Sequence, residues 1–254
     1  MTTRRAPQPP APQDADDRAW FLDVDGTLLE IAREPHLVTA DADLLSLLVS
    51  LRETCGGAVA LVSGRSLEQI DDIFGRFDIA AAGSHGLELR LPDGTVERHA
   101  GAVPAASLAV MEDLASRHGE LLLERKPFSA SLHYRRRPGL ELQVLEAMEA
   151  ALRRAGGGFR LLRGKMVVEL LPLAADKGSA IRTFMENPPF RGRRPVFAGD
   201  DVTDEHGFAV VNAMRGTSVR VGGSAATAAN WRLANVTALR AWLRAALAPA
   251  GNAP

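Results

Sequence analysis

The sequence is poor in several features that would define its class. It has one cysteine, Cys55, in 254 residues, which excludes an intrachain disulfide and predicts a reducing compartment such as the cytoplasm. No apolar run approaches the roughly 20 residues of a membrane-spanning helix, so we expect no membrane partner. The 30 basic and 31 acidic side chains nearly cancel, which gives no general attraction to nucleic acid. We therefore expect a small-molecule partner, with any anion bound locally, and a monomer or weak homo-oligomer.

The ends of the chain differ in composition from the rest. Residues 1–17 are rich in proline, alanine and glutamine and lack the apolar stretch of a secretory signal, so we expect a disordered tail. The last residues, 249–254, are expected to fray. The remaining length is sufficient for one large domain or two unequal ones.

Short apolar runs alternate with helical patterns in two separate parts of the chain. Continuously apolar strands of this length are typical of a parallel sheet that is covered on both faces. The two parts, 18–100 and 173–248, therefore predict one α/β domain with a doubly wound parallel sheet. The expected strands are 20–23, 58–62, 79–82, 195–198 and 218–221, the expected helices are 41–54, 67–77, 177–185, 205–211 and 236–247, and a hairpin is expected over 87–98.

Residues 101–172 interrupt this alternation. Helical patterns at 104–118 and 140–155 alternate with strand-like patterns at 121–134, which Pro127 breaks, and at 159–171. Two strand–helix pairs can form an α+β unit of their own. We therefore predict that 101–172 is an inserted domain.

Two aspartates follow the first expected strand, in the segment Asp23-Val24-Asp25-Gly26-Thr27. Gly26 permits a sharp turn that lets Asp25 curl back toward Asp23. Two ionised carboxylates this close repel each other, and a bound divalent cation offsets the repulsion and keeps the first one anionic. Because an anionic aspartate can attack phosphorus, the pattern indicates a nucleophile and a proton donor that share one metal ion. The alternative is an ordinary Asp-Gly turn at a strand end.

The other expected core strands also end in small, polar or charged residues. In an open parallel sheet, the carboxyl ends of the strands gather the functional groups. Ser63 and the backbone N–H groups after it suit a phosphate oxygen, and Lys177 can meet phosphate as a point charge. Taken singly, these residues could be helix caps or solvated side chains. The segments concerned are 63–66, 83–86, 176–179 and 199–205, the last of which contains Asp200.

The order of these motifs is Asp-x-Asp-Gly-Thr, Ser-Gly-Arg, Lys-Gly and Gly-Asp-Asp, which resembles the haloacid dehalogenase superfamily of phosphohydrolases. The insertion resembles the α/β cap of that superfamily. From about Phe21 to Leu243 the chain is similar to the trehalose-6-phosphate phosphatases, with family-level matches at 61–66, 83–86, 132–135, 164–169, 199–205 and 229–233. The resemblance implies a Rossmann-like core with an inserted cap. It also implies a Mg²⁺-dependent phosphatase that acts on trehalose 6-phosphate through an aspartyl-phosphate.

The resemblance implies a role for each matching position of the core. Asp23 would attack phosphorus, and Asp25 would protonate the departing sugar oxygen and then deprotonate water. Mg²⁺ would be held by Asp23, the backbone carbonyl of Asp25, and Asp200. Asp201 and Asp204 would lie behind these ligands, or either would replace a water. The phosphoryl group would be held by Ser63 and Lys177, and the substrate would also be bound by Arg65, His85 and Gly86.

Two segments of the expected cap carry candidate sugar-binding residues. Lys165 and Glu169 are four positions apart in a strand-like segment, so we expect them on one face, as a donor and an acceptor for sugar hydroxyls. His133 and Arg135 are expected to share a face in the same way. By themselves, both patterns also fit solvated amphipathic strands. The family resemblance favours sugar binding.

Other functions on the same core are kept as alternatives. A phosphatase of sucrose phosphate, mannosylphosphoglycerate or a nucleotide, or a phosphomutase, would use the same core motifs. The two cap motifs argue against these. A catalytically silent regulatory domain is an alternative of another class, against which the intact Asp23, Asp25, Lys177 and Asp200 argue.

Overall fold

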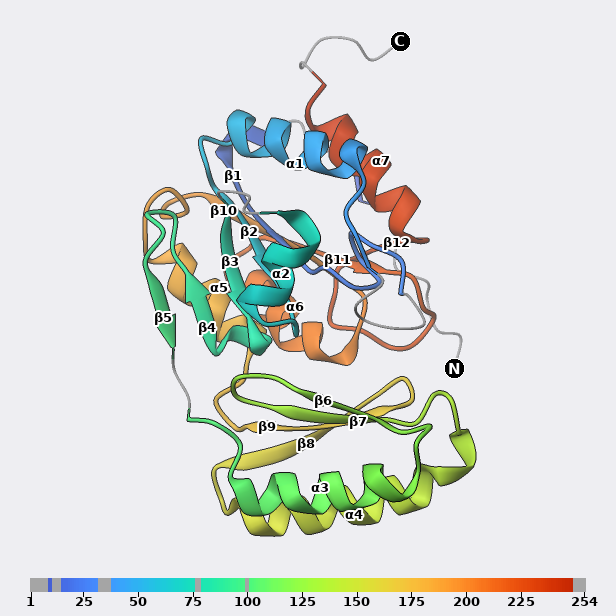
Figure 1. Ribbon diagram of the computed structural model, residues 1–254. Helices are drawn as coiled ribbons and strands as arrows, with labels where there is room; N and C mark the ends of the chain where they lie inside the picture. The colour runs from blue at the N-terminus through green and yellow to red at the C-terminus, as the bar shows by residue number, and fades with distance from the viewer. Residues whose placement is uncertain (1–8, 11–14, 32–37, 76–78, 99–100, 249–254) are drawn as a thin grey trace. The chain divides into compact units, whose positions relative to one another are not determined.

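A computed structural model of the protein describes residues 9–10, 15–31, 38–75, 79–98 and 101–248. The chain divides into two compact units. The first, here called the core unit, comprises 1–97 and 176–254; the second, the cap unit, comprises 98–175. The sequence predicts an insertion over 101–172. Figure 1 shows the elements of each unit.

The core unit is built on a sheet of eight strands in the order β12-β11-β10-β1-β2-β3-β4-β5. The pairings from β12 to β3 are parallel, and β4 is antiparallel to β3. The predicted doubly wound parallel sheet is therefore confirmed. The strands are β1 (Arg18–Leu22), β2 (Val59–Val62), β3 (Ala80–Gly83), β4 (Glu88–Arg90), β5 (Val96–Arg98), β10 (Arg194–Gly199), β11 (Thr217–Val221) and β12 (Trp231–Leu233).

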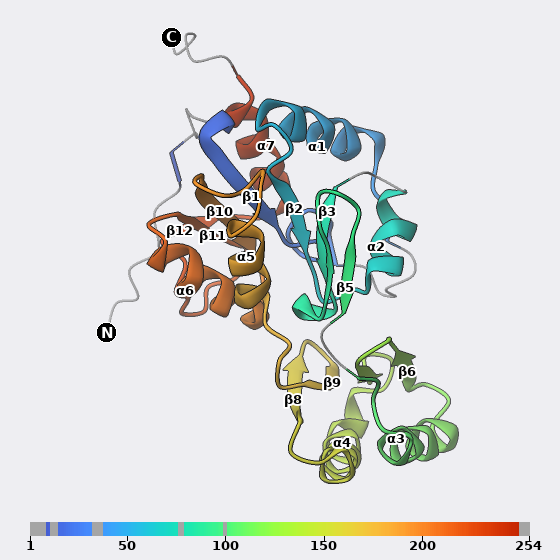
Figure 2. The same cartoon turned by 90° about the vertical axis from the view of Figure 1, so that its left-hand side faces the viewer.

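Helices cover both faces of this sheet, with α1 and α7 on one face and α5 and α6 on the other (Figure 2). The strands between them are apolar because both faces are buried; Trp20, Phe21 and Leu22 of β1 are fully buried. No helix in the described part of the chain is long and apolar enough to cross a membrane. The helices are α1 (Ala42–Thr54), α2 (Leu67–Phe74), α5 (Lys177–Met185), α6 (Glu205–Ala213) and α7 (Val236–Ala246).

Apart from shifts of one or two residues at the ends of elements, the core unit differs from the sequence prediction in three places. Helix α2 ends at Phe74, because Gly75 leaves the helix with φ +73°, and the last two residues of the expected helix, 76 and 77, lie outside the described residues. The edge strand β12 was not predicted, since three residues are too few for a visible alternation. In the segment expected to be disordered, Ala15–Asp17 forms a 3-10 turn whose Ala15 carbonyl accepts a hydrogen bond from Trp20 Nε1 at 3.3 Å.

The cap unit has a four-stranded antiparallel sheet in the order β6-β7-β9-β8, together with two helices. One face of the sheet carries Leu132, Val168 and Leu170, which form a second hydrophobic cluster with helix residues such as Met111 and Met148. The elements are α3 (Ala105–Arg117), β6 (Leu122–Arg125), β7 (Ala130–His133), α4 (Glu141–Ala155), β8 (Phe159–Gly164) and β9 (Val167–Pro172).

Two expectations about the cap strands are wrong. The strand-like run 159–171 is a hairpin, in which Lys165 and Met166 form the turn between β8 and β9 and Met166 has φ +65°. Lys165 therefore shares no strand face with Glu169, which lies within β9. Arg135 likewise lies beyond the end of β7, so it shares no strand face with His133.

Candidate active site

Asp23 and Lys177 meet in the interior of the core unit. Asp23 lies one residue beyond β1, and Lys177 is the first residue of α5, a helix that the side chain of Asp176 caps. Lys177 Nζ donates hydrogen bonds to Asp23 Oδ1 at 2.7 Å and to Asp204 Oδ1 at 2.6 Å. Thr27 Oγ1 donates to the other oxygen of Asp23 at 2.8 Å, which fixes the orientation of this carboxylate.

The pKa values of Asp23 and Lys177 both lie above their ordinary values. Burial raises the pKa of the Asp23 carboxyl well above its usual range, Lys177 opposes this, and the nearby Asp204 and Asp200 raise the pKa further. Burial alone would lower the pKa of Lys177, but Asp204 and Asp23 outweigh it and the pKa lies above its ordinary value. The lysine is thus charged at neutral pH, and the surplus of acidic groups around it suits a cation.

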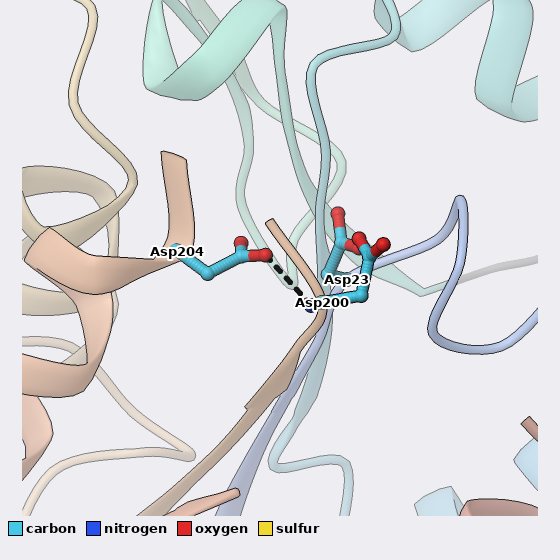
Figure 3. A group of neighbouring side chains, drawn as sticks. All are labelled: Asp23, Asp200 and Asp204. Atoms are coloured by element: carbon cyan, nitrogen blue, oxygen red, sulfur yellow. Dashed lines mark hydrogen bonds between the residues drawn. The ribbon is translucent and has the colours of Figure 1, made fainter. Parts of the chain in front are cut away.

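Asp23, Asp200 and Asp204 each offer a carboxylate oxygen within 4.8 Å of the others. This all-oxygen set fits Mg²⁺ or Ca²⁺ better than Zn²⁺, which prefers nitrogen and sulfur. Figure 3 shows Asp23 and Asp200 side by side, whereas Asp204 points to the backbone of Asp200. A Cβ on Gly26 would lie 2.3 Å from Asp200 Oδ2, so the Asp200 carboxylate fits beside this turn only because residue 26 is glycine.

Both oxygens of Asp204 are engaged within the protein. Oδ1 accepts from Lys177, and Oδ2 accepts from the backbone N–H groups of Asp200 and Asp201, both at 2.9 Å. Asp204 thus orients the lysine and the loop that presents Asp200. Both oxygens of Asp23 also accept hydrogen bonds, but the Asp23 and Asp200 carboxylates lie side by side (Figure 3), so these two are better placed to share a metal ion.

The side chain of Asp25 lies against Arg65. Arg65 Nε donates to Asp25 Oδ2 at 2.7 Å, and Nη2 donates to Oδ1 at 2.6 Å. The sequence predicts both residues at the site, Arg65 as a substrate-binding residue. Their contact with each other was not predicted.

The ends of β2 and β3 meet, as the sheet topology predicts. Ser63 is buried, and its backbone carbonyl accepts from the N–H of His85 at 2.9 Å. The His85 ring lies against Gly64, where a Cβ would be 2.6 Å from Cε1. His85 has φ +57°, a left-handed conformation that is uncommon outside glycine and is often found at functional sites. Gly86 has φ +94°, and a Cβ there would lie 2.7 Å from the Asp176 carbonyl oxygen.

Two of the candidate sugar-binding residues, Glu169 and His133, have side-chain partners within the cap unit. Glu169 Oε1 accepts from Ser129 Oγ at 2.6 Å and from Lys126 Nζ at 3.2 Å. His133 Nε2 lies 2.9 Å from Glu124 Oε2. The two turns also meet, since Arg135 Nη2 donates to the carbonyl of Lys165 at 3.3 Å.

Glu124 and Lys126 were missed from the sequence. They lie at and just beyond the end of β6, and Glu124 pairs in register with Ser131 on the next strand. The available signal was the position of the Pro127 break. It places 122–125 and 130–133 opposite each other as a hairpin, in which Glu124 faces Ser131 and reaches its diagonal neighbour His133.

The parallel sheet and the α+β insertion give the chain the fold of the haloacid dehalogenase-like hydrolases. A haloacid dehalogenase-like hydrolase from Bacteroides thetaiotaomicron has this fold, with a TM-score of 0.64 over 89% of this chain and 97% of that one at 15% identity. Within this class, the chain belongs to the trehalose-phosphatase family, whose model matches residues 21–237.

Relatives of known name are similar over most of their length. A protein of Sinorhizobium fredii named probable trehalose-phosphate phosphatase is 42% identical over 210 residues, which is 82% of this chain and 79% of the relative. The trehalose-6-phosphate phosphatase of Escherichia coli K12 is 40% identical over 227 residues, which is 89% of this chain and 85% of the relative. The expected family is confirmed.

Proposed function

We propose that this protein hydrolyses trehalose 6-phosphate to trehalose and inorganic phosphate, in a Mg²⁺-dependent reaction through an aspartyl-phosphate on Asp23. The observation that carries the proposal is the buried contact between Asp23 and Lys177 at the carboxyl ends of the core strands. It supports the proposal because the proposed nucleophile would act beside a fixed positive charge, in a chain of the trehalose-phosphatase family. We further propose that the protein acts in the cytoplasm, which its single cysteine supports, and in trehalose biosynthesis, which its family supports.

In the first half of the proposed reaction, an oxygen of Asp23 attacks phosphorus while the bond from phosphorus to the sugar oxygen breaks. Lys177 and Ser63 hold the phosphoryl oxygens, and Asp25 gives a proton to the departing sugar oxygen. In the second half, Asp25 takes a proton from water, which attacks phosphorus and releases Asp23. Asp23, Asp200 and the backbone carbonyl of Asp25 would hold Mg²⁺, which would supply charge neutralisation when bound.

The proposed sugar-binding groups lie in the cap unit. Glu169 offers a carboxylate, and Lys165 lies in an exposed turn, so the pair can accept from and donate to sugar hydroxyls. His133, Arg135, His85 and Gly86 are the other proposed substrate residues. The names of the two relatives support trehalose 6-phosphate as the substrate over sucrose or nucleotide phosphates.

The test is release of inorganic phosphate from trehalose 6-phosphate, measured beside sucrose 6-phosphate and glucose 6-phosphate. We expect a clear preference for trehalose 6-phosphate, loss of activity on chelation and recovery with Mg²⁺ but not with Zn²⁺. Asp23→Asn removes the nucleophile and should abolish turnover with the fold intact, whereas Asp71→Asn, which affects a carboxylate bound to Arg90, should not. Full activity after exhaustive chelation, or full activity of the Asp23→Asn variant, would contradict the proposed mechanism.

A further inference from the structure

Arg65 binds the carboxylate of Asp25 through a bidentate salt bridge, here called the grip. Two parallel hydrogen bonds of 2.7 and 2.6 Å join the guanidinium edge to the two carboxylate oxygens. The side chain of Arg65 is 10% exposed, whereas that of Asp25 is 36% exposed. The buried arginine is therefore the fixed partner, and the carboxylate that it holds reaches solvent.

The backbone of Arg65 is anchored on both sides. Its N–H donates to Ser63 Oγ at 3.1 Å, and its carbonyl accepts from the N–H of Ser84 at 2.6 Å. These bonds tie Arg65 to the ends of β2 and β3, whereas Asp25 belongs to the turn after β1. The grip therefore joins the turn that carries the proposed proton donor to two neighbouring strand ends.

The geometry of the grip limits where the Asp25 carboxylate can point. A planar guanidinium that binds both oxygens fixes the plane of the carboxylate as well as its position, which a lysine ammonium cannot do. Each carboxylate oxygen offers about two acceptor positions, and the grip uses one on each oxygen. Acceptor positions therefore stay available for the proton that Asp25 is proposed to move.

We propose that Arg65 is a positioning residue that acts on the reaction through Asp25. It sets the carboxylate for proton transfer and does not bind the sugar or the phosphate. This proposal rests on the proposed function, in which Asp25 is the acid and the base. It differs from the substrate-binding role that the sequence suggests for Arg65.

The experiment is a double-mutant cycle on trehalose 6-phosphate and on p-nitrophenyl phosphate. The variants are Arg65→Ala, Asp25→Asn and the two combined, with Arg65→Lys added. We expect Arg65→Ala to lower kcat for trehalose 6-phosphate by roughly 10- to 100-fold with little change in KM, part of the loss expected for an acid–base group. In the Asp25→Asn background, Arg65→Ala should cause no further loss. Arg65→Lys keeps the charge but not the planar edge, so it should resemble Arg65→Ala.

The aryl phosphate supplies a readout that a structural role would not move. Its leaving group scarcely needs a proton, so Arg65→Ala should release one equivalent of nitrophenolate at the wild-type rate and then turn over slowly. Arg90→Ala is the matched control, because Arg90 Nη1 also binds both oxygens of an aspartate, Asp71, at 2.7 and 2.9 Å. It should keep wild-type kinetics, and thermal unfolding of each variant checks the fold.

Three results would overturn the proposal: losses that multiply in the double variant, a change confined to KM, or a slowed nitrophenolate burst. Each would mean that Arg65 contacts the substrate or acts independently of Asp25. The substrate assignment can fail separately. A wild-type protein that hydrolyses p-nitrophenyl phosphate but not trehalose 6-phosphate would contradict only the proposed substrate, and the cycle on the aryl phosphate would still decide the role of Arg65.

Discussion

Charged side chains are arranged differently in the two units of this protein. In the core unit, the side chains of Lys177, Asp23 and Asp204 are 3%, 5% and 0% exposed and bind one another. In the cap unit, the side chains of His133 and Glu124 are 23% and 17% exposed, and those of Lys126 and Glu169 are 10% and 9% exposed. Removing one partner of a buried pair leaves the other charge buried without a partner, which lowers the free energy of unfolding by about 3–5 kcal/mol. Removing one partner of a pair near water changes the free energy of unfolding little.

This difference matches two tasks of a sugar-phosphate hydrolase. The phosphoryl group carries the charge that develops in the reaction, so the groups that meet it gain from being fixed in advance. Sugar hydroxyls are neutral and can replace one partner of a cap pair with a similar hydrogen bond. We therefore propose that the core charges serve any phosphate ester and that the cap charges select the ester.

The largest expected effect comes from breaking the buried core network. Lys177→Ala removes the charge that we propose binds the phosphoryl group, so kcat/KM should fall by roughly 10²–10³-fold or more on both trehalose 6-phosphate and p-nitrophenyl phosphate. Stability should fall by about 3–5 kcal/mol in urea unfolding, because Asp23 and Asp204 lose their partner. Arg182→Ala, in the same helix but 52% exposed, is the control and should change neither.

A double variant separates the two effects of Lys177. Lys177→Met combined with Asp204→Asn removes one charge of each sign, so stability should recover in part while activity stays lost. An Lys177→Ala protein that hydrolyses p-nitrophenyl phosphate normally would contradict the proposed role in the phosphoryl site.

A smaller and substrate-specific effect is expected in the cap. Lys165→Ala and Glu169→Ala should each lower kcat/KM for trehalose 6-phosphate by roughly ten- to a thousandfold, the loss of one or two charge-assisted hydrogen bonds. Hydrolysis of p-nitrophenyl phosphate should stay almost normal, because it has no sugar. Arg163→Ala changes an exposed charge in the same hairpin and should leave both reactions unchanged. Wild-type activity of both cap variants on trehalose 6-phosphate would mean that this hairpin is only a solvated surface.

The grouping of the core residues was predictable because the sheet topology brings the ends of its strands together. Each apolar strand could be recognised in the sequence, and parallel strands bring their carboxyl ends to one edge of the sheet. That Asp23, Ser63 and Asp200 lie at the same edge could therefore be predicted without any distances. Which of these charged residues bind each other could not be predicted from the topology. Several charges converge there, and only the folded geometry shows that Asp204 binds Lys177 while Arg65 binds Asp25.

The cap was harder because its pattern depends on one turn. The alternation of faces holds only while a strand continues, and the turn at Lys165 and Met166 resets it. Neither residue is typical of a two-residue hairpin turn, which usually contains glycine or asparagine. The chain nonetheless turns there, with Met166 in the left-handed conformation.

The smallest expected effect tests whether the two units unfold separately. Cys55 is fully buried in the core unit, and burial raises the pKa of its thiol to about 11, so alkylation near pH 8 should require unfolding of that unit. Leu132 and Leu48 are both fully buried, but they belong to the separate hydrophobic clusters of the cap and the core. Either leucine changed to alanine should cost about 2–5 kcal/mol in its own unit. Leu48→Ala should then speed alkylation by iodoacetamide in mild urea, and Leu132→Ala should leave the rate at its wild-type value. Equal acceleration by both variants would mean that the two units unfold as one.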